Sequence, residues 1–406
     1  MTTQTHTLSN GLRIIHLSSN SQVAYCGFAV NAGSRDEMQK EHGLAHFVEH
    51  TLFKGTRKRK AWHILNRMEN VGGELNAYTT KESTFIYSIF LEKDFTRAIE
   101  LMSDLVSNAQ FPENELKKEY EVILDEIQSY EDSPSELIFD DFENLLFDGH
   151  PLGHHILGKK STLKTFNTAT GKSFLEKFYV AGNMAFFSMS CTDFRQVLKI
   201  AEKYMTPIPV LKNPILREKP PVVLKQEIHK KKKTHLSHVI LGGRAYDMNN
   251  ENRYPLFLLN NILGGPGMNS RLNLVLREKN GLVYQVESNI TSYTDTGVFN
   301  IYFGTDPKNR DQALNLVEKE ITALCTNKLT TTQLAAAKKQ AVGQLGVAGD
   351  NKESQFLGLG KSFLHYNRYE TLPEIFAHIE KITAAQILET ANETIHPDKL
   401  FKLIYG

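Results

Sequence analysis

The expected pattern of strands and helices occurs twice in this sequence, on either side of a proline-rich segment. This repeat limits the fold more than any other feature. Five of the 13 prolines lie between residues 207 and 221, and they predict a linker over residues 207–227. A chain of 406 residues is also too long for a single core of ordinary size. The sequence therefore predicts two domains, residues 1–206 and residues 228–406.

The first half alternates between segments typical of strands and segments typical of helices. Strands rich in β-branched and aromatic residues are expected at 11–17, 23–30, 74–79, 84–91 and 185–191. Helical apolar spacing follows the turn at 31–34 and occurs again at 61–71, 96–106, 113–130, 133–147, 171–178 and 194–204. This order indicates an α+β domain.

The second half has the same character. Strands are expected at 238–245, 283–292, 298–305 and 400–405. Helices are expected at 254–263, 271–279, 313–325, 331–345, 353–365 and 384–395. We therefore expect an α+β fold of two structurally similar domains, a duplicated αβ roll in which a mixed or antiparallel sheet is packed with helices.

One helix of each half can be aligned position by position. Residues 46–52 (His-Phe-Val-Glu-His-Thr-Leu) correspond to residues 257–263 (Phe-Leu-Leu-Asn-Asn-Ile-Leu), and the apolar positions agree. The two histidines and the glutamate of the first copy become Phe257, Asn260 and Asn261 in the second. This is the pattern of a duplicated domain whose second copy has no metal site.

The helix of the first copy places metal-ligating side chains in an otherwise apolar segment. His46 and His50 are four residues apart and share one face of a helix, so both imidazoles can bind one ion, and Glu49 lies between them. A catalytic zinc site needs a third protein ligand and one position for water, on which Glu49 would act as the base. The alternative is a core histidine held by hydrogen bonds.

The acidic segment 113–130 is the best candidate for the third ligand. Glu119 and Glu126 are seven residues apart and share a face, so one could bind the metal while the other supports a ligand histidine. Spacing alone does not choose between the acids of this segment. Most of them are expected to be surface side chains.

Composition excludes several other classes of function. Lys and Arg total 47 against 46 for Asp and Glu, and this net charge of +1 gives no general attraction to nucleic acid or to an anionic membrane. The first residues contain neither a basic leader nor an apolar segment, and no apolar run reaches the length of a membrane span. We therefore expect a cytoplasmic protein, or an organellar or periplasmic one if a presequence has been removed. Three widely spaced cysteines fit a reducing compartment.

The motif His46-Phe47-Val48-Glu49-His50 is followed, 76 residues after His50, by Glu126 within Glu-Val-Ile-Leu-Asp-Glu. This arrangement resembles the pitrilysin/insulinase family of inverted-motif zinc peptidases. The length is similar to that of its short two-domain branch, which includes mitochondrial processing peptidases and bacterial processing-protease-like proteins. The resemblance implies one Zn²⁺ per chain held by His46, His50 and Glu126. It also implies that Glu49 is the general base and Glu119 the carboxylate supporting a ligand.

Two further stretches extend the resemblance. Gly72-Gly-Glu-Leu-Asn-Ala-Tyr-Thr79 is similar to the family's edge strand, on which the substrate lies as an added β-strand. This implies substrate contacts at Asn76, Ala77 and Tyr78.

Arg277-Glu-Lys-Asn-Gly-Leu-Val-Tyr284 resembles the family's Arg and Tyr pair, which reaches the substrate from the half opposite the zinc. The resemblance implies catalytic roles for Arg277 and Tyr284. Without it, a cation at a helix C-terminus and an aromatic residue in a strand would be the preferred explanations.

The resemblance implies a zinc metalloendopeptidase that hydrolyses extended or unfolded peptides bound as an added β-strand. Longer members enclose a chamber with four such domains. A chain with two is therefore expected to form a homodimer, or a heterodimer with a related subunit, to supply both the zinc ligands and the Arg/Tyr pair. The alternative is a non-catalytic peptide-binding or core subunit of a processing-peptidase-like complex. The intact His46, Glu49, His50 and Glu126 favour the enzyme.

Overall fold

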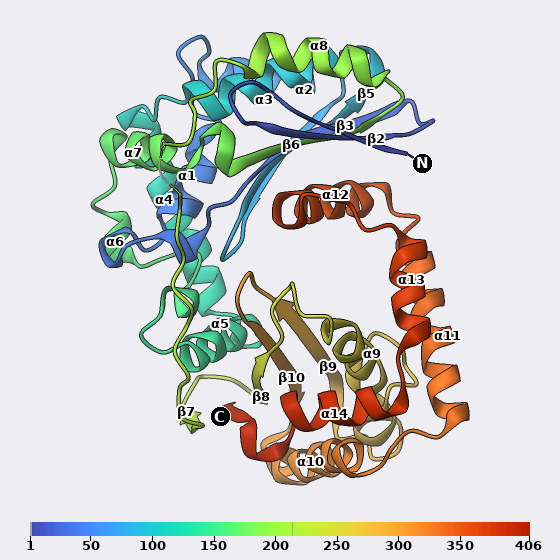
Figure 1. Cartoon of the computed structure of the whole chain (residues 1–406). Coiled ribbons are helices and arrows are strands. Elements are labelled where there is room, and N and C mark those ends of the chain that lie inside the picture. Colours follow the sequence, from blue (N-terminus) through green and yellow to red (C-terminus); the bar gives the residue numbers. More distant parts are fainter. Residues whose placement is uncertain (1, 213) are drawn as a thin grey trace. The chain divides into compact units, whose positions relative to one another are not determined.

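The computed structural model describes residues 2–212 and 214–406, which form two compact units (Figure 1). Residue 213, inside the predicted linker, lies outside the described residues. Unit 1 comprises Met1–Gln128, His154–Arg217 and Asn351–Tyr369; unit 2 comprises Ser129–Gly153, Glu218–Asp350 and Glu370–Gly406. Each unit contains one β-sheet packed with helices, which confirms the predicted α+β class and its two similar halves.

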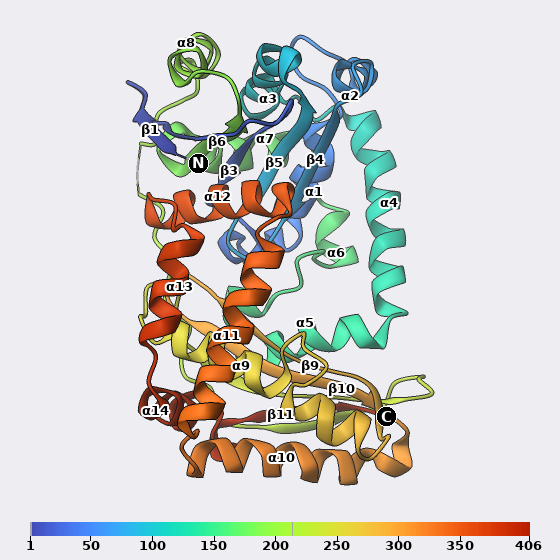
Figure 2. The same ribbon diagram turned by 90° about the vertical axis from the view of Figure 1, so that its right-hand side faces the viewer.

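The sheet of unit 1 has six strands in the order β1-β2-β6-β3-β5-β4. Their bounds are β1 Thr3–Thr7, β2 Arg13–Ser18, β3 Val23–Val30, β4 Glu74–Thr79, β5 Thr84–Leu91 and β6 Met184–Ser190. The β2–β6 pair is parallel and the other pairs are antiparallel. Strand β4 therefore forms one edge of the sheet, next to the helix with the predicted metal ligands (Figure 2).

Helices cover both faces of this sheet, which explains why its central strands are apolar on both sides. On β3, Phe28 belongs to a core shared with the long helices of the unit, while Tyr25 packs against α12 on the other face (Figure 1). The helices are α1 Leu44–Leu52, α2 Ala61–Glu69, α3 Phe95–Asn108, α4 Glu113–Glu131, α6 Lys160–Leu163, α7 Thr168–Phe178, α8 Phe194–Met205 and α12 Lys352–Tyr366. The last residues of α4 belong to unit 2.

The sheet of unit 2 has five strands in the order β7-β11-β8-β10-β9. They are β7 Glu227–Lys230, β8 Ser237–Ala245, β9 Val283–Ser292, β10 Gly297–Thr305 and β11 Phe401–Tyr405. The helices are α5 Pro134–Leu146, α9 Arg253–Gly264, α10 Arg310–Thr326, α11 Thr331–Ala348, α13 Leu372–Lys381 and α14 Ala384–Thr394. Residues Asn273–Glu278 form a π-helical turn where the sequence predicts an ordinary helix.

Two helices pack in the unit opposite to their half of the sequence. The Phe356 ring of α12 lies 5.4 Å from Tyr25 and 4.4 Å from Phe187, measured between ring centroids, in unit 1. Helix α5 packs its apolar face, including Phe142, on the sheet of unit 2. The predicted boundary near residues 207–227 divides the chain once. In the structure, α12 comes from the second half of the sequence and belongs to unit 1, whereas α5 comes from the first half and belongs to unit 2.

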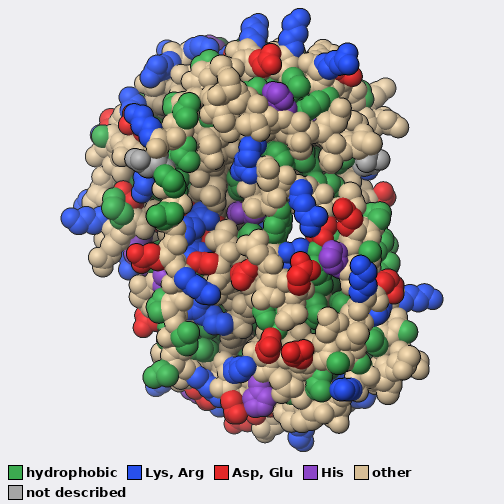
Figure 3. All heavy atoms as spheres, in the orientation of Figure 1, with side chains coloured by type: hydrophobic (Ala, Val, Ile, Leu, Met, Phe, Trp, Pro, Cys, Tyr) green, Lys and Arg blue, Asp and Glu red, His purple; other side chains and the backbone are tan. Residues whose placement is uncertain are grey.

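The sequence patterns did not indicate β1, β7 or α13. All five residues of β1 are exposed, and three of the four in β7 are, so neither strand has the apolar alternation from which a strand is predicted. No helix in the described part of the chain is both long and apolar enough to cross a bilayer. Basic and acidic side chains are interspersed on the face shown in Figure 3, as the balanced composition leads one to expect.

Candidate metal centre

Helix α1 carries the motif, and its start is fixed by a carboxylate. Glu37 accepts backbone hydrogen bonds from Gly43 (2.9 Å, Oε2) and Ala45 (2.7 Å, Oε1). These N–H groups have no partner within the helix, and the helix dipole favours negative charge at this end. Burial raises the pKa of Glu37 well above its ordinary value, and the two backbone bonds oppose that shift.

Two backbone segments cross in close contact at Gly43 and Gly158, beside the start of α1, and we call this contact the glycine crossing. Gly43 and Gly158 have φ values of 94° and 75°, which favour glycine. A Cβ on Gly43 would lie 2.7 Å from the Leu157 carbonyl oxygen, and one on Gly158 would collide with the carbonyl oxygen of His42. The same His42 oxygen accepts a hydrogen bond from Thr162 (2.6 Å). The position of the motif helix is therefore set by close backbone contact.

The three predicted metal ligands converge in unit 1. Glu126 Oε2 lies 3.6 Å from Nε2 of His46 and 3.6 Å from Nε2 of His50. One ligand atom from each residue lies within 4.8 Å of the other two, and no other group of this kind occurs in residues 2–212 and 214–406. Tetrahedral zinc with ligand bonds of 2.0–2.1 Å separates its donor atoms by roughly 3.3 Å. These side chains therefore fit a zinc ion with little movement.

The protonation of the ligands also suits a metal. Burial, and then the neighbouring His50, lower the pKa of His46 to about 3, so its imidazole is neutral and one ring nitrogen has a lone pair that can bind a metal. His50 Nδ1 lies 3.2 Å from Glu119 Oε2, and the other Glu119 oxygen lies 2.6 Å from the Lys54 ammonium. A carboxylate at Nδ1 keeps the proton there and turns Nε2 toward the site.

Glu49 lies beside the three ligands but outside the set. Its side chain is 9% exposed, and its Oε2 accepts a hydrogen bond of 2.7 Å from the Thr79 hydroxyl. Burial raises the pKa of Glu49, and the Thr79 bond opposes the rise. The site thus combines two imidazoles and a carboxylate, able to bind a divalent cation, with a separate carboxylate able to accept a proton.

The predicted substrate strand is β4, and its backbone edge is the part that can bind a peptide. In the described sheet it pairs only with β5, in the register Asn76–Tyr87, Ala77–Ile86 and Tyr78–Phe85. The Tyr78 ring stacks on Phe85 with 4.9 Å between centroids, so this side chain belongs to the packing of unit 1.

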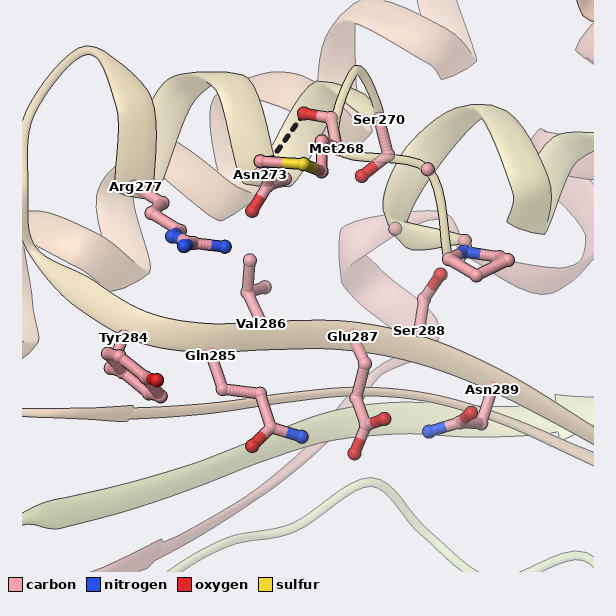
Figure 4. Close-up of a pocket in the computed structure, with 14 residues that line it drawn as sticks. Met268, Ser270, Asn273, Arg277, Tyr284, Gln285, Val286, Glu287, Ser288 and Asn289 are labelled. Carbon is pink, nitrogen blue, oxygen red and sulfur yellow. Dashed lines mark hydrogen bonds between the residues drawn. The ribbon is translucent and has the colours of Figure 1, made fainter.

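Arg277 and Tyr284 lie together in unit 2. Arg277 is in the π-helical turn, and its guanidinium is 5.9 Å from the centroid of the Tyr284 ring at the start of β9. Tyr284 is 87% exposed. Both line a cavity of about 440 Å³ between the glycine-rich residues 264–267 and residues 284–289 of β9 (Figure 4).

Three residues that the sequence patterns did not single out also contribute to the centre in unit 1. Glu37 and Lys54 lie just outside the motif helix, and Thr79 ends the predicted substrate strand. Glu37 lies six residues before the N-cap Gly43, outside the positions from which a sequence rule identifies a helix cap. Lys54 and Thr79 meet their partners only through tertiary packing, which no spacing rule predicts.

Two family models match consecutive parts of the chain. Residues 13–160 match a model described as "Insulinase (Peptidase family M16)", and residues 167–341 match one described as "Peptidase M16 inactive domain". The second description agrees with Phe257, Asn260 and Asn261 at the positions aligned with the motif.

The sequences of similar proteins align with almost the whole chain. A Bacillus subtilis protein named "Uncharacterized zinc protease YmxG" is 31% identical, covering 98% of this chain and 97% of the relative. An "Uncharacterized zinc protease" of Rickettsia felis is 34% identical over 95% of this chain and 93% of its own. The mitochondrial-processing peptidase subunit beta of Bos taurus is 30% identical over 96% and 81%.

Solved structures show the same fold. A Pseudomonas fluorescens structure described as a peptidase M16 inactive domain superposes with a TM-score of 0.93 at 21% identity, covering 100% of this chain and 98% of the other. A protease from Helicobacter pylori gives a TM-score of 0.91 at 21% identity, covering 100% and 99%. At this identity the likeness concerns the fold alone.

Proposed function

Because this chain belongs to the insulinase family of peptidases, family M16, we propose that it is a zinc-dependent endopeptidase that hydrolyses extended or unfolded peptides. The observation that supports the proposal is the convergence of His46, His50 and Glu126 on one point beside Glu49. A peptide-binding subunit without activity would not need a free buried carboxylate next to a complete set of metal ligands.

A zinc ion held by these ligands would supply Lewis acidity and lower the pKa of a bound water. The proton transfers belong to Glu49. Its carboxylate takes a proton from the attacking water and later gives it to the leaving amine. Burial, which raises the pKa of Glu49, favours a group that can both accept and release a proton.

The substrate would add as a strand to the free edge of β4, at Asn76, Ala77 and Tyr78. Backbone hydrogen bonds would then supply most of the affinity, and alternate side chains would add preference. Most strands of a folded protein are already paired in a sheet, so the expected substrates are unstructured peptides.

Arg277 would hold the backbone of the substrate, and the exposed Tyr284 hydroxyl would donate a hydrogen bond to the oxyanion. We propose that these two residues act in a homodimer, in which each copy supplies the pair for the site of the other. A heterodimer with a related subunit is the alternative.

A mixing experiment tests the shared site. Glu49→Gln and Tyr284→Phe copies, inactive or weak alone, are co-refolded in equal amounts. Half of the dimers are then mixed, and each mixed dimer has one site with both intact residues, so activity should return to about a quarter of the wild type. Activity that stays at the level of the separate variants would contradict the shared site. Sedimentation at the assay concentration measures the dimer directly.

Metal analysis coupled to mass-spectrometric mapping of cuts in a peptide mixture tests the function itself. Glu49→Gln should keep the metal and lose hydrolysis, because the ligands are untouched. His50→Ala should lose the metal. Glu69→Gln, an exposed glutamate at the end of α2, is the matched control and should change neither. Full turnover in Glu49→Gln, or wild-type cleavage that survives complete removal of metal by a chelator, would refute the proposal.

A further inference from the structure

We propose that Thr79 is a positioning residue for the general base: its hydroxyl fixes the rotation of the Glu49 carboxylate and leaves Oε1 as the oxygen that takes the proton. This inference rests on the proposed function. It concerns a residue at the end of the strand that would receive the substrate, and not one of the metal ligands.

The direction of the hydrogen bond follows from its neighbours. Thr79 Oγ1 lies 2.7 Å from Glu49 Oε2 and 3.5 Å from the hydroxyl of Thr84. The Thr84 hydroxyl donates its single hydrogen to the Ala32 carbonyl oxygen at 3.0 Å. An ionised carboxylate can only accept, so the single hydrogen of Thr79 is committed to Glu49.

This bond restrains the carboxylate, and the Thr79 backbone N–H is a second donor to Glu49. Among the described residues, Thr79 alone donates a side-chain hydrogen bond to Glu49. The terminal torsion of a glutamate is broad, so the plane of the carboxylate would rotate more freely without the Thr79 hydroxyl. A hydrogen bond to a charged acceptor is about twice as strong as a neutral one. Occupying Oε2 therefore leaves Oε1 as the oxygen that does not bond to the Thr79 hydroxyl.

The alternation of β4 explains why Thr79 can do this. Ala77 packs with the core on the side of α1, while Tyr78 packs on the opposite face of the sheet. Residues two apart in a strand share a face, so Thr79 points toward α1 as Ala77 does. The strand that would receive the peptide is thus joined to the base by one hydrogen bond, and a displacement of β4 on peptide addition would move the carboxylate.

A purely structural role is the competing explanation, in which Thr79 only satisfies a buried carboxylate. The two explanations differ in what they predict for kcat, KM and the serine variant. If Thr79 only stabilises the fold, its removal lowers the melting temperature and leaves the turnover of the folded enzyme unchanged.

The test compares Thr79→Val, Thr79→Ser and the control Thr394→Val in the zinc-loaded protein. Thr79→Val keeps the β-branched shape and should lower kcat about tenfold or more, with KM within about twofold, since general acid–base catalysis contributes at least 10²-fold. Thr79→Ser should restore kcat to within about threefold. Thr394→Val removes a buried hydroxyl that donates to the Thr390 carbonyl oxygen at 2.7 Å on α14, in unit 2, and should leave kcat unchanged. Wild-type kcat in Thr79→Val, or no rescue by serine, would overturn the inference.

Crystal structures supply a second measurement that needs no activity. The plane of the Glu49 carboxylate should have one rotation in the wild type and a different or more widely spread rotation in Thr79→Val, with the same zinc content in both proteins. A single unchanged orientation in the valine variant would also overturn the inference. If the wild type cleaves no peptide, the proposed function fails, and the carboxylate orientation still decides the role of Thr79.

Discussion

His50 contacts Glu119, and Glu119 in turn contacts Lys54. We therefore predict that Lys54, which is not a metal ligand, affects the affinity for the metal. Lys54 holds one oxygen of Glu119 at 2.6 Å while the other faces His50 Nδ1 at 3.2 Å. Lys54→Met frees Glu119 to turn away, so zinc affinity should fall about three- to tenfold, below the 10–100-fold typical of losing the supporting carboxylate itself. Competition with a fluorescent chelator measures it.

Lys118→Met is the matched control for this change. Lys118 also pairs with a glutamate of α4, Glu115, at 2.8 Å, but its side chain is 67% exposed and lies outside the metal centre. Its replacement should leave zinc affinity unchanged. Equal affinities for Lys54→Met and the wild type would show that Glu119 holds its position without the ammonium.

A buried histidine in unit 1 predicts a loss of stability in acid. His16 is fully buried with Nδ1 2.9 Å from the Ser188 hydroxyl, and burial lowers its pKa from 6.5 to about 4. Below pH 6.5 the unfolded chain binds a proton that the folded chain does not, so the free energy of unfolding falls as pH drops toward 4. A difference of 2.5 in pKa corresponds to about 3 kcal/mol.

Denaturant unfolding of metal-free protein at pH 7, 6, 5 and 4 measures this contribution. His16→Asn keeps a polar partner for Ser188 but does not titrate, so its stability should depend less steeply on pH than that of the wild type. The exposed His6 of β1 gives the control His6→Asn, which should follow the wild-type curve. Parallel curves for the wild type and His16→Asn would contradict the assignment.

At the scale of the element, the position of α1 depends on the glycine crossing at its start. Gly158→Ala places a Cβ against the carbonyl oxygen of His42 at a φ of 75°. The variant should lose stability and zinc affinity together, because the start of the helix that carries His46 and His50 must move. Urea unfolding and chelator competition on the same samples measure both quantities.

Gly11→Ala separates backbone strain from the collision. Gly11 also has a positive φ, 87°, but a Cβ there would meet nothing within 4 Å. The control should cost only the strain of this conformation, about 1–2 kcal/mol, and leave zinc affinity unchanged. If both variants lose the same stability and Gly158→Ala keeps its zinc affinity, the crossing does not position the helix.

Elements with strong apolar periodicity could be predicted from the sequence, and so could the part of the site that lies within one of them. His46, Glu49 and His50 are related by the geometry of a single helix. The choice of Glu126 over Glu119 required the family resemblance, because both lie on one face of α4 and only the packing of α4 against α1 distinguishes them. The contacts of Lys54 and Thr79 join separate elements, so no local pattern contains them.

At the scale of the whole molecule, the linker pattern does not show which residues pack together. Proline spacing locates a change along the chain, whereas a compact unit is defined by contacts in space. The apolar faces of α5 and α12 can be recognised in the sequence. In a duplicated fold, however, such a face could pack against either of two similar sheets. The choice is made by complementary side chains, such as the Phe356 and Phe187 rings, stacked with 4.4 Å between centroids.

This exchange predicts that a substitution late in the chain weakens the unit that contains the candidate metal centre. Phe356 is fully buried in unit 1, so Phe356→Ala should lower the unfolding free energy of that unit by about 3–5 kcal/mol. Native-state hydrogen exchange should then show lost protection in β3, β5 and β6, and little change in β8 and β10. Phe142→Ala, on α5, is the reciprocal variant and should produce the opposite pattern. Loss of protection that followed the position of each residue in the sequence would mean that the units do not exchange these helices.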